Sequence, residues 1–419
     1  MPRSSSWPVR AVISLLLAGA LGCSTLSAVP TAAPAAGTAA ATLPPASPAA
    51  LSPEPASPEP GASSTPAPTA APGDTATPEA TPLPPTATAP PEVLLFPILQ
   101  GGLFGYMDAS GQVVIQPQFA LAGDFREGLA QVYVNGLFGY IDPSGATVIE
   151  PRFELAAQFS DGLALVQIDG LFGYIDPTGA IVIEPQFDGA SDFSEGLAFV
   201  TPSYEDGGLG GYIDASGEFV IEPQFVYGEA FSEGLAFVTP TYEGGGLGGF
   251  INPSGESVIP VQFAHAGPFS EGLALATFIE PSDAPKYGYI NPSGEFVIEV
   301  QFDGAQPFSE GLAAVEIIQA DGTPRVGFIN PAGEFVIEPQ FLKVGNFSEG
   351  LAGVMFQEGG APLGYGIVDQ TGATVIEPQF YSYYGTEPPT FHNGLALVEM
   401  EGGKAYINRA GEIVWGPAQ

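Results

Sequence analysis

The sequence predicts an all-β protein: a tandem array of about eight three-stranded β repeats that follows a disordered linker. Two observations support this prediction. One pattern recurs eight times between Gly101 and the C-terminus, and tandem repeats bury their core against their neighbours. No window sustains the 3.6-residue apolar periodicity of a helix, whereas the residues beside the predicted turns are aromatic or β-branched, as in strands.

Each copy contains a glycine within Phe-Ser-Glu-Gly-Leu-Ala or a close variant, and these glycines define the register of the array. They are Gly128, Gly162, Gly196, Gly234, Gly272, Gly311, Gly350 and Gly394, with spacings of 34, 34, 38, 38, 39, 39 and 44 residues. A partial ninth copy at residues 405–414 lacks this motif, as is common for a terminal repeat.

The first half of each repeat predicts a hairpin, for example over residues 171–183. Asp176-Pro177-Thr178-Gly179 has the composition of a type I turn, with Asp at the first position and Pro at the second, where its fixed φ fits. The closing glycine suits a left-handed bulge. The residues on both sides are therefore expected to form two paired strands.

The second half of each repeat predicts a short loop and a third strand. The Glu-Pro pair ends the second strand or confines it to an edge, and Gln-Phe begins the loop. Gly196, Ala198 and Val200 would then share one face of a third strand that packs closely on backbone. A standard propeller blade needs about 40 to 45 residues, which disfavours that form, but an open curved array and a closed propeller-like ring both remain compatible.

Residues 1–22 have the layout of a secretory signal peptide. Arg3 and Arg10 precede an apolar stretch at residues 11–21, which is shorter than the roughly 20 residues of a membrane-spanning helix. Leu15 to Cys23 resembles a bacterial lipobox, which implies lipidation of Cys23. The usual leucine three residues before the cysteine is replaced by Ala20, so ordinary signal cleavage is the alternative.

Residues 23–92 are expected to be a disordered linker that begins at the lipobox cysteine. Ala, Pro, Thr and Ser dominate this segment, and such a composition cannot bury enough apolar surface to fold. The repeat domain then occupies residues 93–419. The predicted location is the cell envelope, with a membrane anchor on Cys23, or secretion if the cysteine is not lipidated.

Charge and composition exclude several classes of partner. The formal net charge is −37, which disfavours nucleic acid because phosphate binding needs clustered Lys and Arg. With one cysteine the chain forms no internal disulfide, and two histidines are too few for a repeated zinc site. No motif for a cofactor, a resident metal or catalysis is present, so none is predicted.

The repeat is similar to the bacterial WG repeat family, whose unit runs Trp-Gly, Tyr-Ile-Asp, Gly, Val-Ile, Pro, Tyr or Phe, then Phe-x-Glu-Gly-Leu-Ala. The resemblance covers Gly101 to about Trp415 and implies a β-rich binding or structural repeat without catalytic residues. The tryptophan is replaced in every copy, which predicts looser packing or a groove in the middle repeats. Its place is taken by Phe104, Phe138, Phe172, Gly210, Gly248, Tyr287, Val326, Tyr365 and Lys404.

Two sets of repeated acids have competing explanations. One set occupies the first turn position, where Asn substitutes in four copies, and this exchange favours turn capping over proton transfer. Its members are Asp108, Asp142, Asp176, Asp214 and Asp369. The other set precedes the register glycine and is explained by solvated or turn-capping acids, or by a ladder of Ca²⁺ ligands. Its members are Glu127, Asp161, Glu195, Glu233, Glu271, Glu310 and Glu349.

Insertions after the third strand differ between copies and are expected on one face, which in repeat proteins is often the binding face. Residues 201–208 and 239–246 are near duplicates that contain Tyr204 and Tyr242, and Tyr381, Tyr383 and Tyr384 cluster near the C-terminus. These five tyrosines are the candidate ligand-binding residues, since aromatic rings stack on sugars and clasp peptides. The alternative is that they cover loop backbone.

These observations predict a non-enzymatic cell-surface lipoprotein, a binding or scaffolding module for an envelope protein or a surface glycan. The alternative is a carbohydrate-active enzyme that uses paired carboxylates.

Overall fold

The repeats fold into small antiparallel sheets in the computed structural model, and each copy as defined from the sequence contributes to two of them. Residues 171–187, for example, form the last two strands of one sheet, and residues 189–201 form the first two strands of the next. The structure describes residues 94–205, 207–242, 246–278, 285–358, 361–381 and 387–416, all within the unit formed by Pro85–Gln419. The predicted signal peptide, Cys23, the whole predicted linker, Tyr383 and Tyr384 lie outside these residues. Nine sheets follow one another along the described chain, and we call them blades 1 to 9.

The strands of the first five blades are as follows. Blade 1 contains β1 (Leu95–Gln100), β2 (Leu103–Asp108) and β3 (Val113–Phe119); blade 2 contains β4 (Leu121–Ala122), β5 (Ala130–Val134), β6 (Leu137–Ile141) and β7 (Thr147–Phe153); blade 3 contains β8 (Leu155–Ala156), β9 (Ala164–Ile168), β10 (Leu171–Ile175) and β11 (Ile181–Phe187); blade 4 contains β12 (Gly189–Ala190), β13 (Ala198–Thr201), β14 (Gly210–Ile213) and β15 (Phe219–Phe225); blade 5 contains β16 (Tyr227–Gly228), β17 (Ala236–Thr239), β18 (Gly248–Ile251) and β19 (Ser257–Phe263).

The remaining blades repeat the same order. Blade 6 contains β20 (His265–Ala266), β21 (Ala274–Thr277), β22 (Tyr287–Ile290) and β23 (Phe296–Phe302); blade 7 contains β24 (Gly304–Ala305), β25 (Ala313–Ile318), β26 (Pro324–Ile329) and β27 (Phe335–Phe341); blade 8 contains β28 (Lys343–Val344), β29 (Leu351–Glu358), β30 (Ala361–Asp369) and β31 (Thr374–Phe380); blade 9 contains β32 (Phe391–His392), β33 (Leu395–Met400), β34 (Gly403–Asn408) and β35 (Ile413–Trp415).

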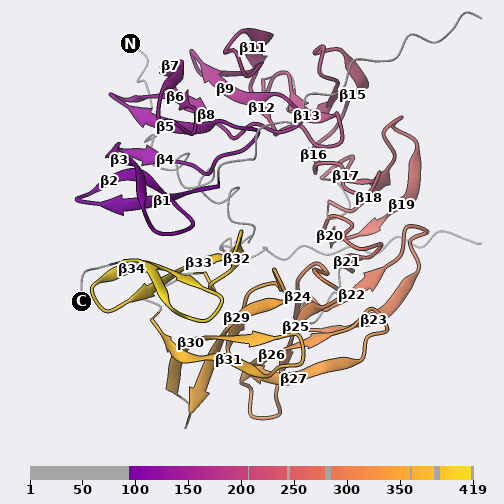
Figure 1. Cartoon of the computed structure of the whole chain (residues 1–419). Helices are drawn as coiled ribbons and strands as arrows, with labels where there is room; N and C mark the ends of the chain where they lie inside the picture. The colour runs from indigo at the N-terminus through magenta and orange to yellow at the C-terminus, as the bar shows by residue number, and fades with distance from the viewer. Residues whose placement is uncertain are drawn as a thin grey trace, which may run out of the picture. The chain divides into compact units, whose positions relative to one another are not determined.

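The all-β prediction is confirmed, and the structure adds a fourth strand to blades 2 to 9. The predicted loop after Gln-Phe contains a two-residue strand, such as β12, which pairs with β13 through Gly189 and Ala190. Gly196 lies in the turn before β13, with φ of 80°, and not in the strand as predicted. Figure 1 shows the short strands β12, β16, β20 and β24 on the inner side of a ring, and β15, β19, β23 and β27 on its outer side.

The glycine of the Trp-Gly position is required by a bulge in the outer strand. In blade 4, Tyr212 pairs with Ile221 and Gly210 with Phe225, so three residues of β15 lie opposite Gly211. A Cβ on Gly211 would lie 2.3 Å from the carbonyl oxygen of Ile221. Only glycine allows this approach of two backbones.

The hydrophobic core lies between blades, as expected of stacked repeats. Between blades 4 and 5, for example, Tyr212 and Ile221 pack against Phe231 and Val238. The buried tyrosine hydroxyls also join neighbouring blades, because each donates to a carbonyl of the next inner segment at 2.7 Å. The pairs are Tyr106 to Gly123, Tyr140 to Ala157, Tyr174 to Ser191, Tyr212 to Glu229 and Tyr289 to Gln306.

The same kind of contact joins blade 9 to blade 1, so the array is a closed propeller. Phe96, Ile98 and Met107 of blade 1 pack with Leu395 and Tyr406 of blade 9. The Tyr406 hydroxyl donates to the carbonyl of Pro97 at 3.0 Å. Blades 1 and 9 share no strand, so the ring is closed by side-chain packing and this hydrogen bond.

The sequence predicted looser packing or a groove in the middle repeats, and this prediction is wrong at the tryptophan position of blades 4 and 5. A Cβ on Gly210 would lie 2.2 Å from Cζ of Phe199, and a Cβ on Gly248 would lie 2.2 Å from Cζ of Phe237. These two phenylalanines come from the neighbouring strand of the same blade. They fill the space that the missing aromatic residue leaves.

The antiparallel order gives the ring two different ends. The Ser-Glu-Gly turn before the second strand and the Asp-x-Ser-Gly turn between the third and fourth strands lie at one end, which we call the turn end. The connection between the second and third strands lies at the other, which we call the loop end. Within the ranges described, no helix is long and apolar enough to cross a membrane.

Candidate functional site

Two exposed tyrosines project from equivalent loops of adjacent blades at the loop end. Tyr204 follows β13 of blade 4 and is 63% exposed, and Tyr242 follows β17 of blade 5 and is 74% exposed. The repeated tyrosines of the hairpin motif have the opposite environment, since Tyr174 and Tyr212 are completely buried. Tyr204 and Tyr242 are therefore not part of the structural repeat.

Each loop tyrosine is held against the start of the inner strand of its own blade. The backbone N–H of Tyr204 donates to the Asp188 carboxylate at 2.8 Å, and its hydroxyl lies 2.5 Å from where a Cβ on Gly189 would be. The Tyr242 hydroxyl approaches the carbonyl oxygen of Val226 at 3.4 Å. The hydroxyl ends are thus positioned while much of each side chain stays exposed.

A third exposed tyrosine, Tyr227, directly follows the Val226 anchor and is 47% exposed. It was not among the residues predicted from the sequence. Equivalent positions hold Leu121, Leu155, Gly189, His265, Gly304 and Lys343. The available signal was therefore that Tyr227 is the one phenol ring among variable residues. The structure therefore adds Tyr227 to the aromatic surface of blade 5.

Tyr381 is not brought together with Tyr204 and Tyr242. It is 53% exposed and its N–H donates to the carbonyl of Glu399 in β33 at 2.8 Å, which places it on blade 9. Blades 6, 7 and 8 separate it from blade 5 on one side of the ring, and blades 1, 2 and 3 separate it from blade 4 on the other. Its neighbours Tyr383 and Tyr384 lie outside the described residues.

The acids at the first turn position cap their turns, as predicted. Oδ1 of Asp176 accepts hydrogen bonds from the Thr178 N–H at 2.9 Å, from the Thr178 hydroxyl at 2.6 Å and from the Ala180 N–H at 3.0 Å. The hydrogen bond from the Thr178 hydroxyl is the main cause that lowers the pKa of Asp176 below its ordinary value. Asn291 accepts the same set through its amide oxygen, which explains the exchange of Asp and Asn.

The acids before the register glycine form a hydrogen-bonded ladder between blades. Each carboxylate accepts the N–H of the register glycine one blade further on, at 2.7 to 3.1 Å. The pairs are Glu127 with Gly162, Asp161 with Gly196, Glu195 with Gly234, Glu233 with Gly272, Glu271 with Gly311, Glu310 with Gly350 and Glu349 with Gly394. The residues themselves adopt left-handed φ of 51° to 56°, so the turn aims each side chain at its neighbour.

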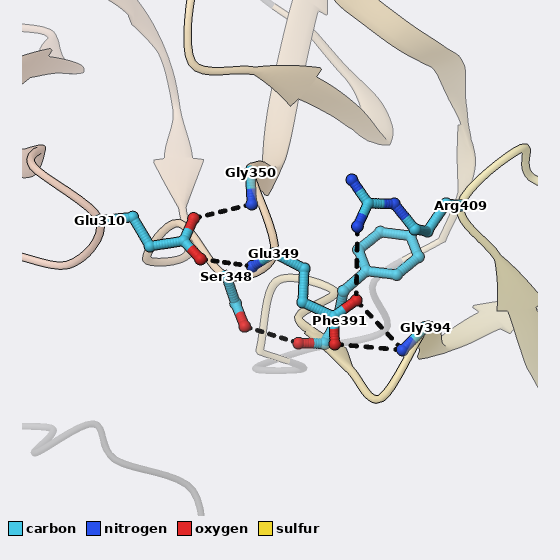
Figure 2. A network of polar contacts seen from close by, with 7 residues as sticks. All are labelled: Glu310, Ser348, Glu349, Gly350, Phe391, Gly394 and Arg409. Atoms are coloured by element: carbon cyan, nitrogen blue, oxygen red, sulfur yellow. Dashed lines mark hydrogen bonds and ion pairs between the residues drawn. The ribbon is translucent and has the colours of Figure 1, made fainter.

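The serines of the same turns form a parallel ladder. The Ser348 hydroxyl of blade 8 donates to the carbonyl of Phe391 in blade 9 at 2.7 Å, beside the Glu349 carboxylate and its contact of 3.7 Å with Arg409 (Figure 2). The other pairs are Ser160 with Phe193, Ser194 with Phe231, Ser232 with Phe269, Ser270 with Phe308 and Ser309 with Phe347. The Ser-Glu-Gly motif and its variants therefore link blades 2 to 9 in order.

The sequence suggested that these acids are solvated, cap turns or bind Ca²⁺, and none of these explanations included hydrogen bonds between blades. Their oxygens are engaged by amides, and the described residues contain no group of three or more His, Cys, Asp or Glu side chains that could hold a metal ion. Periodicity at the length of a whole repeat was the only signal, and it does not show which groups meet between repeats.

Replacing Glu233 by alanine is expected to lower the free energy of unfolding by about 1 kcal/mol, because the Gly272 N–H loses its acceptor. Glu233→Gln keeps a side-chain oxygen and should cost less. Chemical denaturation of both variants measures the difference, with Glu222→Ala on the outer strand as the control.

A chelator should leave the melting temperature of the parent protein unchanged, and a drop of several degrees would instead support Ca²⁺ binding by the ladder.

Comparison with known proteins connects these repeats to a family. No curated protein matches the chain. The computationally designed protein Ika8 matches with 12% identity and a TM-score of 0.40, over 68% of this chain and 95% of that chain. A protein assigned as TolB from Agrobacterium tumefaciens matches with 14% identity and a TM-score of 0.28, over 45% of this chain and 82% of that chain.

The family model described as WG containing repeat matches eight times. The matched residues are 104–138, 138–172, 172–201, 211–239, 249–277, 287–317, 327–359 and 365–404. Together they cover more than half of the chain, and they leave out the connections at 202–210, 240–248, 278–286, 318–326 and 360–364. This chain therefore belongs to the WG containing repeat family.

Proposed function

We propose that this protein is a non-enzymatic binding or scaffolding module on the cell surface, with the Tyr204 and Tyr242 loops as its contact face. The observation that carries the proposal is the exposure of these side chains, 63% and 74%, on equivalent loops of adjacent blades. Tyrosine supplies a large amphipathic contact area at low entropic cost and is enriched at binding hot spots. The partner is an envelope protein or a surface glycan.

The position of β1 in blade 1 supports a tethered arrangement. β1 ends at the Gln100–Leu103 connection, which belongs to the loop end, so Leu95 lies at the turn end. The first described strand therefore starts at the end of the propeller opposite to the Tyr204 and Tyr242 loops. Lipidation of Cys23 with two or three acyl chains, as the lipobox resemblance implies, would suffice for stable anchoring, with Tyr204 and Tyr242 at the end of the propeller away from the first strand's start.

The proposal is tested by screening the full chain for saturable binding to envelope proteins and surface polysaccharides. Replacing Tyr204 and Tyr242 together by alanine is expected to weaken the binding found by more than about tenfold, because both aromatic contacts are lost. Val182→Ala, which truncates a side chain that is 42% exposed on the outer strand of blade 3, is the control and should bind as the parent does.

Two results would contradict this assignment. Unchanged affinity of the double variant would remove the two loops as the contact face. Cleavage of a polysaccharide by the purified protein would support the alternative, a carbohydrate-active enzyme with paired carboxylates. A separate Tyr381→Ala variant tests whether the contact surface extends to blade 9.

A further inference from the structure

A pocket of about 460 Å³ opens on the inner segments of blades 4, 5 and 6. It is lined by Ser194 of blade 4, by Tyr227, Glu229, Phe231 and Ser232 of blade 5, and by Pro268 of blade 6. Short inner strands such as β16 lie on the inner side of the ring (Figure 1). Tyr204 and Tyr242 do not line the pocket, although the Tyr242 hydroxyl reaches the carbonyl of Val226, the residue before Tyr227. Its volume suits one long side chain or small molecule.

The ionisable group of this pocket is specific to blade 5. Glu229 stands directly after β16, and no other described blade with the same inner segment has an acid in that place. The equivalent residues are Gly123, Ala157, Ser191, Gly267, Gln306 and Gly345. Since function in a repeat protein resides in what differs between copies, this substitution identifies the pocket as a candidate site.

The hydroxyl groups of the pocket already donate their protons. The Tyr227 hydroxyl donates to Oε1 of Glu229 at 3.1 Å. Ser194 donates to the carbonyl of Phe231 at 2.8 Å, and Ser232 donates to the carbonyl of Phe269 at 2.7 Å. The side chains therefore offer oxygen lone pairs and a carboxylate to a ligand, and no hydroxyl proton is left over.

Glu229 has no cationic partner among the residues that the structure describes. The ion pairs found there join Lys286 to Asp303, Lys343 to Glu387 and Arg409 to Glu349. A half-buried carboxylate without a counter-ion beside an exposed tyrosine ring attracts a cation, through both charge and the ring face. The net charge of −37 adds a long-range attraction of the same sign.

We infer that this pocket binds a primary ammonium group on an apolar stem, as presented by a lysine side chain, with the Glu229 carboxylate as its counter-ion. An ammonium has three N–H donors and no acceptor, which complements a lining of acceptors whose own protons are engaged. A sugar hydroxyl is both donor and acceptor and would find no free side-chain hydroxyl donor. The Tyr227 ring would cover the stem or the charge.

The titration of Glu229 supports this inference and gives it a pH dependence. Burial raises the pKa of Glu229 to about 7, against the opposing effect of the Tyr227 hydrogen bond. Tyr227 from β16 and Tyr212 from β14 face this residue, and both phenols stay neutral because burial raises the pKa of each. Deprotonated Glu229 binds the cation, so affinity should rise about tenfold between pH 6 and pH 8.

The test is a calorimetric titration of the full chain with Nα-acetyl-lysine amide, and with Nα-acetyl-norleucine amide as the neutral analogue of similar shape. We expect saturable binding of the lysine compound only, weakened at least about tenfold in Glu229→Gln. Glu222→Gln, on the exposed outer strand of blade 4, is the matched control and should not change the affinity. Thermal melting of each variant confirms that it is folded.

Cadaverine and an acetylated Gly-Lys-Gly amide distinguish a free amine from a lysine within a polypeptide. Tighter binding of the peptide would indicate a protein partner, and equal binding a free amine. Equal affinity for the lysine and norleucine compounds, no binding of either, or full affinity in Glu229→Gln would each overturn the inference. The variant with alanine at both Tyr204 and Tyr242 shows whether the two sites are independent. If it loses polypeptide binding but still binds the lysine compound, the Glu229 pocket is separate from the proposed contact face.

Discussion

Replacing Gly211 by alanine is expected to lower the free energy of unfolding by about 2 to 3 kcal/mol, measured by chemical denaturation. The added Cβ would lie 2.3 Å from the carbonyl oxygen of Ile221 and 2.8 Å from the backbone nitrogen of Pro223. Both atoms belong to the bulged backbone of β15, which cannot move away without breaking its pairing with β14. One methyl group therefore forces two strands apart.

Gly234→Ala is the matched control for Gly211→Ala. Gly234 has φ of 79° and no atom within 4 Å of an added Cβ, so alanine there meets left-handed strain without a steric clash and should cost about 1 kcal/mol. A larger loss at Gly211 than at Gly234 is the expected order. Equal losses would mean that backbone conformation, and not the close approach of two strands, explains the glycine of the Trp-Gly position.

Replacing Tyr406 by alanine is expected to lower the free energy of unfolding by about 3 to 4 kcal/mol and to open the ring at one place. The Tyr406 ring packs against Phe96 at 5.7 Å between centroids, and its hydroxyl bonds the Pro97 carbonyl. These contacts join the first blade to the last. Hydrogen exchange should therefore show lost protection concentrated in β1, β2, β33 and β34.

Tyr289→Ala provides the comparison for Tyr406→Ala within the array. Tyr289 is completely buried, packs against Phe308 at 4.9 Å and donates to the Gln306 carbonyl. Its loss should affect blades 6 and 7, which remain connected by the chain. Unchanged protection of blade 1 in Tyr406→Ala would contradict closure of the ring through this residue.

The sequence alone predicted features that depend on neighbours along the chain. The Asp-x-Ser-Gly turn is an example, because Asp176 reaches its donors within four residues. The two paired strands beside this turn are another, and they are β10 and β11 in blade 3. Family membership also followed from the sequence, since the repeated motif itself is the signal.

Tertiary structure decided the features that join one repeat to another. The acceptor of the Gly234 N–H is Glu195, 39 residues away, and no local preference indicates that pairing. The two-residue inner strands are too short to show an alternating pattern. Phe199 fills the space left at Gly210, a compensation between two strands that sequence spacing alone did not reveal.

The candidate site residues also fall into those that the sequence predicted and those that only the structure identified. Tyr204 and Tyr242 were predicted because an insertion is visible in the sequence, whereas their separation from Tyr381 depends on the number of blades that the ring contains. Glu229 and Tyr227 became a candidate pair only when the fold placed them in one open pocket with Ser194 and Pro268 of neighbouring blades. Sequence determines the turns, strands and repeat length because these arise from short-range sterics and hydrogen bonds. Ring closure, the ladders and the pocket depend on packing between residues distant in the chain.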